Sequence, residues 1–106
     1  QSKNIQMTSP KGYVFVELVV RDPENFKEHY QPRSTAAVAA FDGKFLSRGG
    51  EVSIKSGPSD DRRRVMIEFE TYEKALAWYD SPLSQEAKTY RDKFAHVITF
   101  YIIQGT

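Results

Sequence analysis

Residues 13–20, YVFVELVV, restrict the fold of this chain more than any other stretch. They are rich in β-branched and aromatic residues, which predicts a strand. Side chains alternate between the two faces of a strand, and both faces are apolar here except for Glu17. This pattern is typical of a central strand that is covered on both sides.

The other segments alternate between helix and strand patterns. RDPEN begins a helix with Asp22 as its N-cap, and Pro32 is expected to kink or divide that helix. The glycine pair in FLSRGGEV is expected to lie inside a strand and to bend or bulge it. The predicted strands are residues 13–20, 44–55, 63–70 and 96–103, and the predicted helices are residues 22–41 and 72–94, the second interrupted at Ser81-Pro82.

The order βαββαβ predicts an α+β, ferredoxin-like domain. Right-handed crossovers give an antiparallel four-stranded sheet in the order 4-1-3-2, with both helices on one face. The other face would then expose the second apolar set of residues 13–20 to water. An exposed apolar patch of that size is typical of an interface, so we expect a homodimer that packs sheet against sheet.

Length and composition fit one domain. The chain has 106 residues, of which 40% are hydrophobic, enough for one modest core. We expect residues 1–10 to be a disordered or expression-derived N-terminal segment and residues 11–106 to form the single domain.

Composition also argues against several classes of function. A net charge of +1 argues against a nucleic-acid partner, and no apolar stretch is long enough for a membrane partner. The basic run Arg62–Arg64 indicates a solvated strand start, with a specific anion site as the alternative. The chain has no cysteines, and no histidines or carboxylates at the spacing of metal ligands, so no metal and no cofactor is expected. A cytoplasmic location is the default.

Several motifs resemble those of the DUF1330 family, small proteins of the dimeric α+β barrel superfamily. They are KGYVFVELVVRDPENF, GKFLSRGGEV, RRRVMIEFETYEKALAWYDSP and the last strand, so the resemblance covers about residues 11–104. It implies a ferredoxin-like protomer and a dimer. The superfamily includes cofactor-independent monooxygenases, polyketide cyclases, lactone isomerases, haem-degrading enzymes and stress-response proteins, so the fold alone does not imply one activity.

A row of charges on the predicted sheet is the first candidate site. If the hairpin turns around Pro58, Arg48 lies opposite Glu68, and Glu17 on the first strand would extend the row. Two carboxylates beside one arginine would raise the pKa of one of them, as a general acid or base requires. Arg48 would then bind a substrate carboxylate or stabilise an enolate. A structural ion pair at the dimer interface is the alternative.

Helical residues supply the other candidates. His29 is a candidate catalytic residue because Tyr30 and Arg33 lie within one turn and would bind substrate. Trp78 lies off the apolar stripe of its helix, so it would either line a ligand pocket or fill the core or an interface.

Acid–base residues without cofactor motifs favour a small cofactor-independent enzyme. Its reaction would be isomerisation, cyclisation or elimination on an apolar oxygenated molecule such as a polyketide or lactone. The alternative is a non-catalytic dimeric protein that binds a small ligand or serves a stress response. Monooxygenase or haem chemistry is a weaker alternative.

Overall fold

The structure is a computed structural model that describes residues 9–106. Four antiparallel strands form one sheet in the order β2-β3-β1-β4, which confirms the predicted order. The strands are β1 (Gly12–Val20), β2 (Lys44–Arg48), β3 (Arg63–Phe69) and β4 (Ala95–Gln104). Most of the predicted N-terminal segment, residues 1–8, lies outside the described residues.

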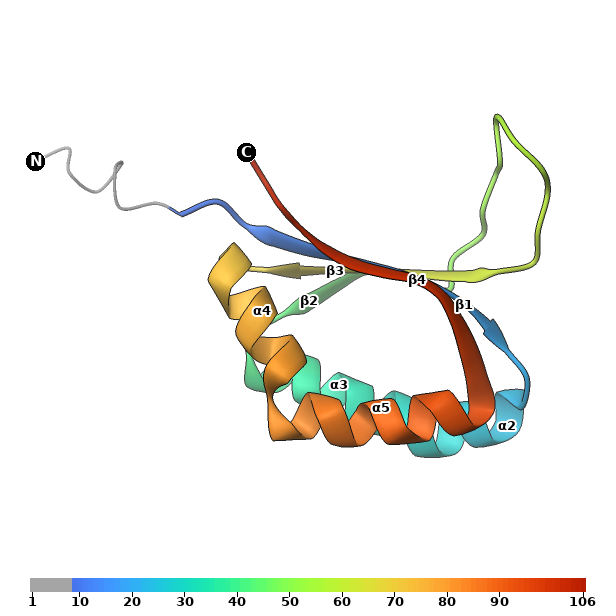
Figure 1. Ribbon diagram of the computed structural model, residues 1–106, viewed down its shortest axis with the longest axis horizontal. Helices are drawn as coiled ribbons and strands as arrows, with labels where there is room; N and C mark the ends of the chain where they lie inside the picture. The colour runs from blue at the N-terminus through green and yellow to red at the C-terminus, as the bar shows by residue number, and fades with distance from the viewer. Residues whose placement is uncertain (1–8) are drawn as a thin grey trace, which may run out of the picture.

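The helices all lie on one side of this sheet (Figure 1). The first helical stretch is continuous and comprises α2 (Pro23–Asn25), a π-helical turn η1 (Phe26–Tyr30) and α3 (Gln31–Ala40). Pro32 therefore does not divide it, but the turn directly before Pro32 is π-helical, and the Gln31 N–H donates to the Phe26 carbonyl five residues back. The second comprises α4 (Tyr72–Asp80) and α5 (Pro82–Phe94), separated at Ser81 as predicted.

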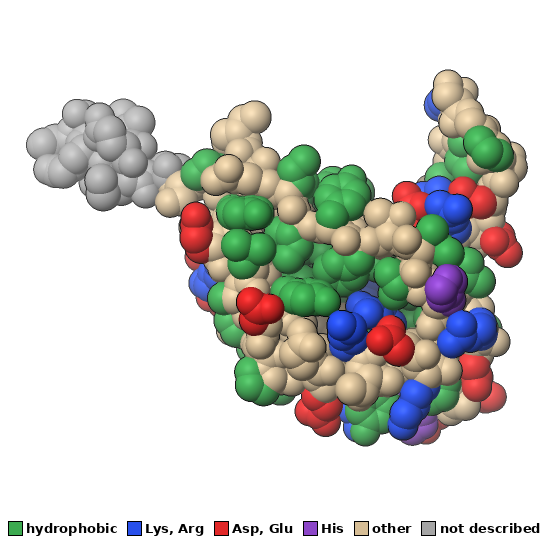
Figure 2. Space-filling model, viewed as in Figure 1, with side chains coloured by type: hydrophobic (Ala, Val, Ile, Leu, Met, Phe, Trp, Pro, Cys, Tyr) green, Lys and Arg blue, Asp and Glu red, His purple; other side chains and the backbone are tan. Residues whose placement is uncertain are grey.

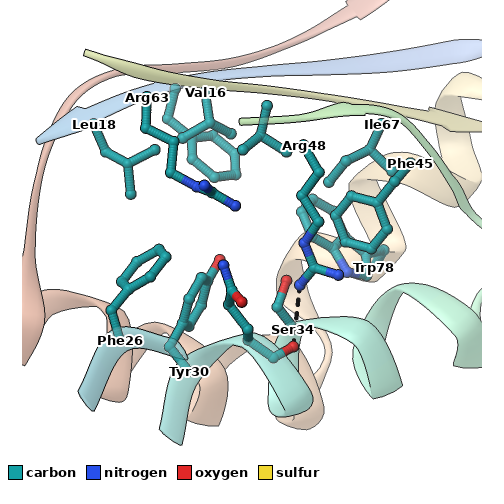
Figure 3. Close-up of a pocket in the computed structure, with 13 residues that line it drawn as sticks. Val16, Leu18, Phe26, Tyr30, Ser34, Phe45, Arg48, Arg63, Ile67 and Trp78 are labelled. Carbon is teal, nitrogen blue, oxygen red and sulfur yellow. Dashed lines mark hydrogen bonds between the residues drawn. The ribbon is translucent and has the colours of Figure 1, made fainter. Parts of the chain in front are cut away.

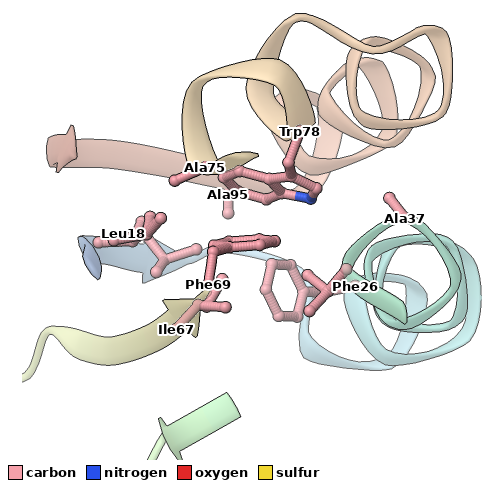
Figure 4. Packing of buried hydrophobic residues seen from close by; sticks show 11 residues of the cluster. Leu18, Phe26, Ala37, Ile67, Phe69, Ala75, Trp78 and Ala95 are labelled. Carbon is pink, nitrogen blue, oxygen red and sulfur yellow. The ribbon is translucent and has the colours of Figure 1, made fainter. Parts of the chain in front are cut away.

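The hydrophobic core fills the space between the sheet and the helices (Figure 4). From β1 it takes one alternating set of side chains, Val14, Val16 and Leu18. Phe69 from β3 is fully buried and packs against the Trp78 ring of α4, with ring centres 5.1 Å apart. The face of β1 that contacts the helices thus builds the core of a single protomer.

The opposite face of the sheet carries the second apolar set and is not covered by any helix within residues 9–106 (Figure 1). Phe15 of β1 stacks there on Tyr101 of β4, with ring centres 5.3 Å apart, and Ile103 lies beside Tyr13. We call this surface the open face. The apolar character that the sequence predicted for it is present.

The connection between β2 and β3 rises on the side of the open face (Figure 1). The prediction that the second strand continues through residues 51–55 is wrong, because β2 ends at Arg48 and those residues belong to an exposed loop. Gly49 begins that loop with a φ of 75°, which turns the chain out of the strand. Within residues 9–106, no helix has both the length and the apolar character that crossing a membrane requires.

Candidate functional site

A one-residue bulge in β2 determines where Arg48 points. Lys44 and Phe45 pair with Glu68 and Ile67, but Ser47 pairs with Met66, so Leu46 is left without a partner. Beyond the bulge Arg48 pairs with Val65. The prediction that Arg48 lies opposite Glu68 is therefore wrong: Lys44 does, and Arg48 projects toward the helices.

Glu17 and Glu68 lie on the open face instead, on the other side of the sheet from Arg48. Glu17 accepts a hydrogen bond of 2.8 Å from Arg62, and its second oxygen lies 3.6 Å from Arg64. The nearest cation to Glu68 is Lys44, at 4.0 Å. The predicted row of Arg48, Glu68 and Glu17 is not formed, because the extra residue in β2 moves the arginine to the opposite face.

Arg48 instead reaches a cavity between the sheet and the first helical stretch (Figure 3). The cavity has a volume of about 30 Å³, measured as the space that the centre of a water molecule can occupy. This is room for roughly two waters. Most of its lining is apolar and the polar side chains are few. The apolar lining is Val16, Leu18, Phe26, Phe45, Val65, Ile67, Trp78 and Phe100, and the polar lining is Tyr30, Gln31, Ser34, Arg48 and Arg63.

Arg48 is held at the wall of this cavity by neutral groups. Its guanidinium donates to the Thr35 hydroxyl at 2.8 Å and to the Gln31 carbonyl at 3.1 Å, and its Cζ lies 4.0 Å from the centre of the Phe45 ring. Burial lowers the pKa of the Arg48 guanidinium; the nearby Tyr30 raises it and Arg63 lowers it. The side chain stays cationic at neutral pH, since arginine does not lose its proton in proteins.

Arg63 enters the same cavity from β3. It pairs with Leu18 of β1, on the helix side of the sheet, and its Cζ lies 5.6 Å from the centre of the Phe26 ring. Its Nε is buried and has no hydrogen-bond partner among residues 9–106. Gly49 lies against the guanidinium, where any Cβ would collide with Nη1 of Arg63.

The cavity is rich in hydrogen-bond donors and poor in negative charge. Trp78 Nε1, like Arg63 Nε, is buried without an acceptor in the described part of the chain. Neither Arg48 nor Arg63 forms an ion pair within residues 9–106. In the described part of the chain, the residues that line the cavity include no Asp, Glu or His. Such a site is complementary to a ligand that supplies anionic oxygen.

His29 and Arg33 lie outside the cavity, on the side of the first helical stretch that faces α5. The His29 ring lies 6.5 Å from the Tyr90 ring, and Arg33 Cζ lies 3.8 Å above the same ring. Arg33 donates to the His29 carbonyl at 2.7 Å. Of the residues proposed from sequence, the structure brings together Tyr30, Arg48 and Trp78, whereas Glu17, Glu68, His29 and Arg33 do not line the cavity.

Arg63 is the functional candidate that the sequence prediction missed. A signal for it exists, because Arg63, Val65, Ile67 and Phe69 alternate along β3 and the last two are buried. Arg63 therefore belongs to the core-facing set of its strand, while Arg62 and Arg64 bind Glu17 and Asp60. The basic run is thus two surface cations and one that points into the cavity.

A model of the family described as Domain of unknown function (DUF1330) matches residues 11–106. The chain belongs to the DUF1330 family. No curated protein matches this DUF1330 chain significantly.

Two solved structures share the fold of this DUF1330 protein. RPA0582, a protein of unknown function from Rhodopseudomonas palustris, is 15% identical with a TM-score of 0.67 over 98% of this chain and 91% of its own. SnoaB, a cofactor-independent oxygenase from Streptomyces nogalater, is 11% identical with a TM-score of 0.65 over 92% of this chain and 95% of its own. At these identities the similarity establishes the α+β fold.

Proposed function

We propose that the cavity, which has room for about two waters, takes in the anionic oxygen group of an apolar, oxygen-bearing small molecule, and that the protein performs cofactor-independent acid–base chemistry on this molecule. The observation that supports this most strongly is the pair of arginines, Arg48 and Arg63, which face a mainly apolar cavity and have no carboxylate partner among residues 9–106. A cation removed from water loses hydration free energy unless an anion or hydrogen-bond acceptors compensate. A carboxylate, phenolate or enolate would supply that compensation.

The arginines would promote the reaction through charge. When a carbon next to a carbonyl group loses its proton, negative charge moves onto the carbonyl oxygen. Guanidinium groups already fixed around that oxygen stabilise the charge without reorganising. The resulting enolate is the common intermediate of isomerisation, cyclisation and elimination.

Tyr30 is the lining residue best suited to assist the proton transfer. Glu17, Glu68 and His29 were predicted for this role, but they lie outside the cavity. The Tyr30 hydroxyl is on the helical wall, between η1 and α3, facing the two arginines (Figure 3). In this proposal a water molecule beside Tyr30 takes the proton from carbon and passes it to solvent, the Tyr30 hydroxyl donates a hydrogen bond to the enolate oxygen, and a proton returns from water to the carbon of the product.

SnoaB gives indirect support, since an enzyme of this fold is described as working without a cofactor. Oxygenation of the same bound anion is the corresponding alternative reaction. The described residues supply no carboxylate and no imidazole to the lining, which favours the second candidate function, a binding protein that does not turn over its ligand. The enzyme and the binding protein would use the same cavity.

We also propose that the partner is a second copy of this chain, packed on the open face. The stacked Phe15 and Tyr101 rings and the neighbouring Ile103 form an apolar surface that would lie in water in a monomer. Such a surface is stabilised when a matching surface removes it from solvent. Two identical open faces meet this requirement.

Trp78 provides a direct test of binding, because it is the only tryptophan of the chain and lines the cavity. Aromatic carboxylates and phenols are titrated while tryptophan fluorescence is followed. Arg48→Gln and Arg63→Gln should weaken binding about tenfold to a hundredfold, the loss expected for hydrogen bonds to a charged group. Lys44→Gln removes the same charge from the same strand on the open face and should leave the affinity unchanged.

Equal ligand affinity in the unmodified protein and all three variants would contradict the proposed binding site.

A second measurement separates an enzyme from a protein that only binds its ligand. Ligands with a carbonyl group are incubated in deuterated buffer, and deuterium uptake at the neighbouring carbon is followed by NMR. An enzyme should accelerate uptake and lose that acceleration in Tyr30→Phe; uptake at the buffer rate with every ligand that binds would rule out the enzyme.

A further inference from the structure

The connection between β2 and β3 contacts little of its own protomer. Every residue from 49 to 61 is exposed, and residues 51–55 form no backbone hydrogen bond with the rest of residues 9–106. Figure 2 shows this connection as a projection that stands clear of the rest of the surface. We call residues 49–62 the arm.

Apolar side chains alternate along the arm, although nothing within residues 9–106 covers them. In the stretch EVSIK, Val52 is 43% exposed and Ile54 is 36% exposed, with Ser53 between them. This alternation is typical of a strand with one covered face. Together with unpaired backbone groups, it suits a segment that pairs with the edge of another sheet.

The base of the arm is fixed so that the arm projects beyond the open face (Figure 1). Arg64 donates to Asp60 at 3.0 and 2.9 Å, and Gly49 donates to the Arg64 carbonyl at 2.9 Å. With 14 residues, the arm can extend about 20 Å from the sheet, whereas two packed sheets lie about 10 Å apart. In the proposed dimer, the arm therefore passes the sheet of the second copy and runs beside one of its edges.

The strand β4 provides an edge that suits this contact. It is the longest strand and, within residues 9–106, it pairs with β1 alone, so the N–H and C=O groups along its outer side are available to another strand. Ile98 lies at the register shift of β4 and is 40% exposed. The edge thus presents both unpaired backbone and an apolar side chain.

A hollow beside this edge adds apolar area and charge. It lies between β4, α4 and α5, with a volume of about 380 Å³, and two of its bordering residues, Leu76 and Tyr101, are 39% and 48% exposed. Figure 2 shows hydrophobic side chains gathered on this side of the molecule. Lys88 at the hollow and Glu51 of the arm form no ion pair within residues 9–106, so their opposite charges are complementary.

A two-fold axis that runs along the strands brings these surfaces together. It places the β2 edge of each copy, from which the arm leaves, beside the β4 edge of the other copy, so the same contact forms twice. An axis across the strands would instead place β2 beside β2 and would leave Leu76 and Ile98 in water.

We infer that residues 51–55 of each copy add to the β4 edge of a second copy as a further strand. Val52 and Ile54 then pack against Ile98 and the hollow beside it. This inference rests on the proposed dimer and goes beyond it, since two open faces can pack without any contact by the arms.

Cross-linking tests the contact directly, because the chain contains no cysteine of its own. Val52→Cys chains are co-expressed with Ile98→Cys chains that carry a size-changing tag, and the purified protein is treated with a short bismaleimide. A cross-linked pair of unequal chains should form. Leu83→Cys, on α5 and 46% exposed, replaces Ile98→Cys as the control and should give no such pair. Leu46→Cys, on β2, reports the alternative axis.

The affinity of the dimer provides a second measurement. Ile54→Asp should raise the dimer dissociation constant at least about tenfold in sedimentation velocity, because a buried unpaired charge is costly and the contact occurs twice. Ser53→Asp places the same charge on the other side of the arm and should leave the dissociation constant unchanged. Both residues are exposed within the protomer, so neither variant should disturb folding.

The outcomes separate the arm contact from the dimer itself. A dimer in which Val52→Cys chains cross-link to Leu46→Cys chains but not to Ile98→Cys chains, or to neither, overturns the inference and leaves the proposed dimer standing. Equal dissociation constants for Ile54→Asp and Ser53→Asp overturn the inference in the same way. A protein that sediments as a monomer at micromolar concentration overturns both.

Discussion

Gly49 and Arg63 are coupled at the scale of single residues. Gly49 has a φ of 75° and donates its N–H to the Arg64 carbonyl at 2.9 Å, while the Arg63 guanidinium occupies the space where a side chain would begin. The glycine therefore meets two requirements, a left-handed backbone and room for a buried cation. The left-handed backbone affects the stability of the fold, and the space beside Gly49 affects the position of Arg63 in the cavity.

Gly49→Ala should separate these effects. The left-handed backbone costs alanine about 1–2 kcal/mol, which should lower the free energy of unfolding in urea. The new Cβ should also displace Arg63 and weaken the binding of aromatic carboxylates. Gly57→Ala is the matched control, because Gly57 also has a positive φ, 96°, with nothing within 4 Å of its Cβ position.

The control should lose stability and keep ligand affinity. If Gly49→Ala binds ligand as the unmodified protein does, the proposed role of Arg63 is wrong.

At the scale of elements, an ion-pair network joins the long loop to β3. Both Asp60 oxygens accept hydrogen bonds from the Arg64 guanidinium, at 3.0 and 2.9 Å, and Asp60 also accepts from the Arg62 N–H at 3.0 Å. Glu17 of β1 contacts the same two arginines. The network fixes the end of the loop on the open face and leaves Arg63 between its members free to point inward.

Asp60→Asn should destabilise the protein in a manner that depends on pH. The hydrogen bond from Arg64, followed by that from the Arg62 backbone, lowers the pKa of Asp60 from 3.8 to about 2. A lowered pKa in the folded state means that the stabilisation is complete above the unfolded value of 3.8 and is lost as the pH falls through about 2. Thermal unfolding midpoints between about pH 2 and about pH 6 measure it.

The difference in thermal unfolding midpoint between Asp60→Asn and the unmodified protein should therefore shrink in acid. It should also shrink in high salt, because Asp60 is near the surface. Asp61→Asn removes the same charge at the neighbouring position without removing a contact of the network. A difference that is independent of pH would contradict the assigned pKa.

The elements themselves are predictable from the sequence, whereas the register of β2 is not. Alternation of apolar residues, the Asp22 cap and the Ser81-Pro82 break are local signals, and each appears in the structure where the sequence indicates it. The bulge at Leu46 depends on how β2 pairs with β3, which nothing in KFLSR encodes. The bulge accounts for the wrong face predicted for Arg48, and the register of the hairpin accounts for the wrong partner, since Lys44 pairs with Glu68 and Arg48 with Val65.

At the scale of the whole molecule, the open face predicts the oligomeric state. Ile103→Glu places a charge on this face and should convert a dimer into a monomer in sedimentation velocity, because a buried unpaired charge is costly. Leu83→Glu is a matched control on α5: Leu83 is 46% exposed and Ile103 is 49% exposed. The control should remain dimeric, and an unmodified protein that sediments as a monomer at micromolar concentration would contradict the prediction.

The bulge at Leu46 also affects how related chains should be compared. Because strand side chains alternate, deleting one residue at this position would transfer the following arginine from the cavity to the open face without changing its identity. Two relatives could then share the letters RGG and use the arginine for different purposes, one for a ligand and one for a subunit contact. An insertion or deletion in β2 thus changes the face to which Arg48 belongs, which a substitution elsewhere in the strand does not.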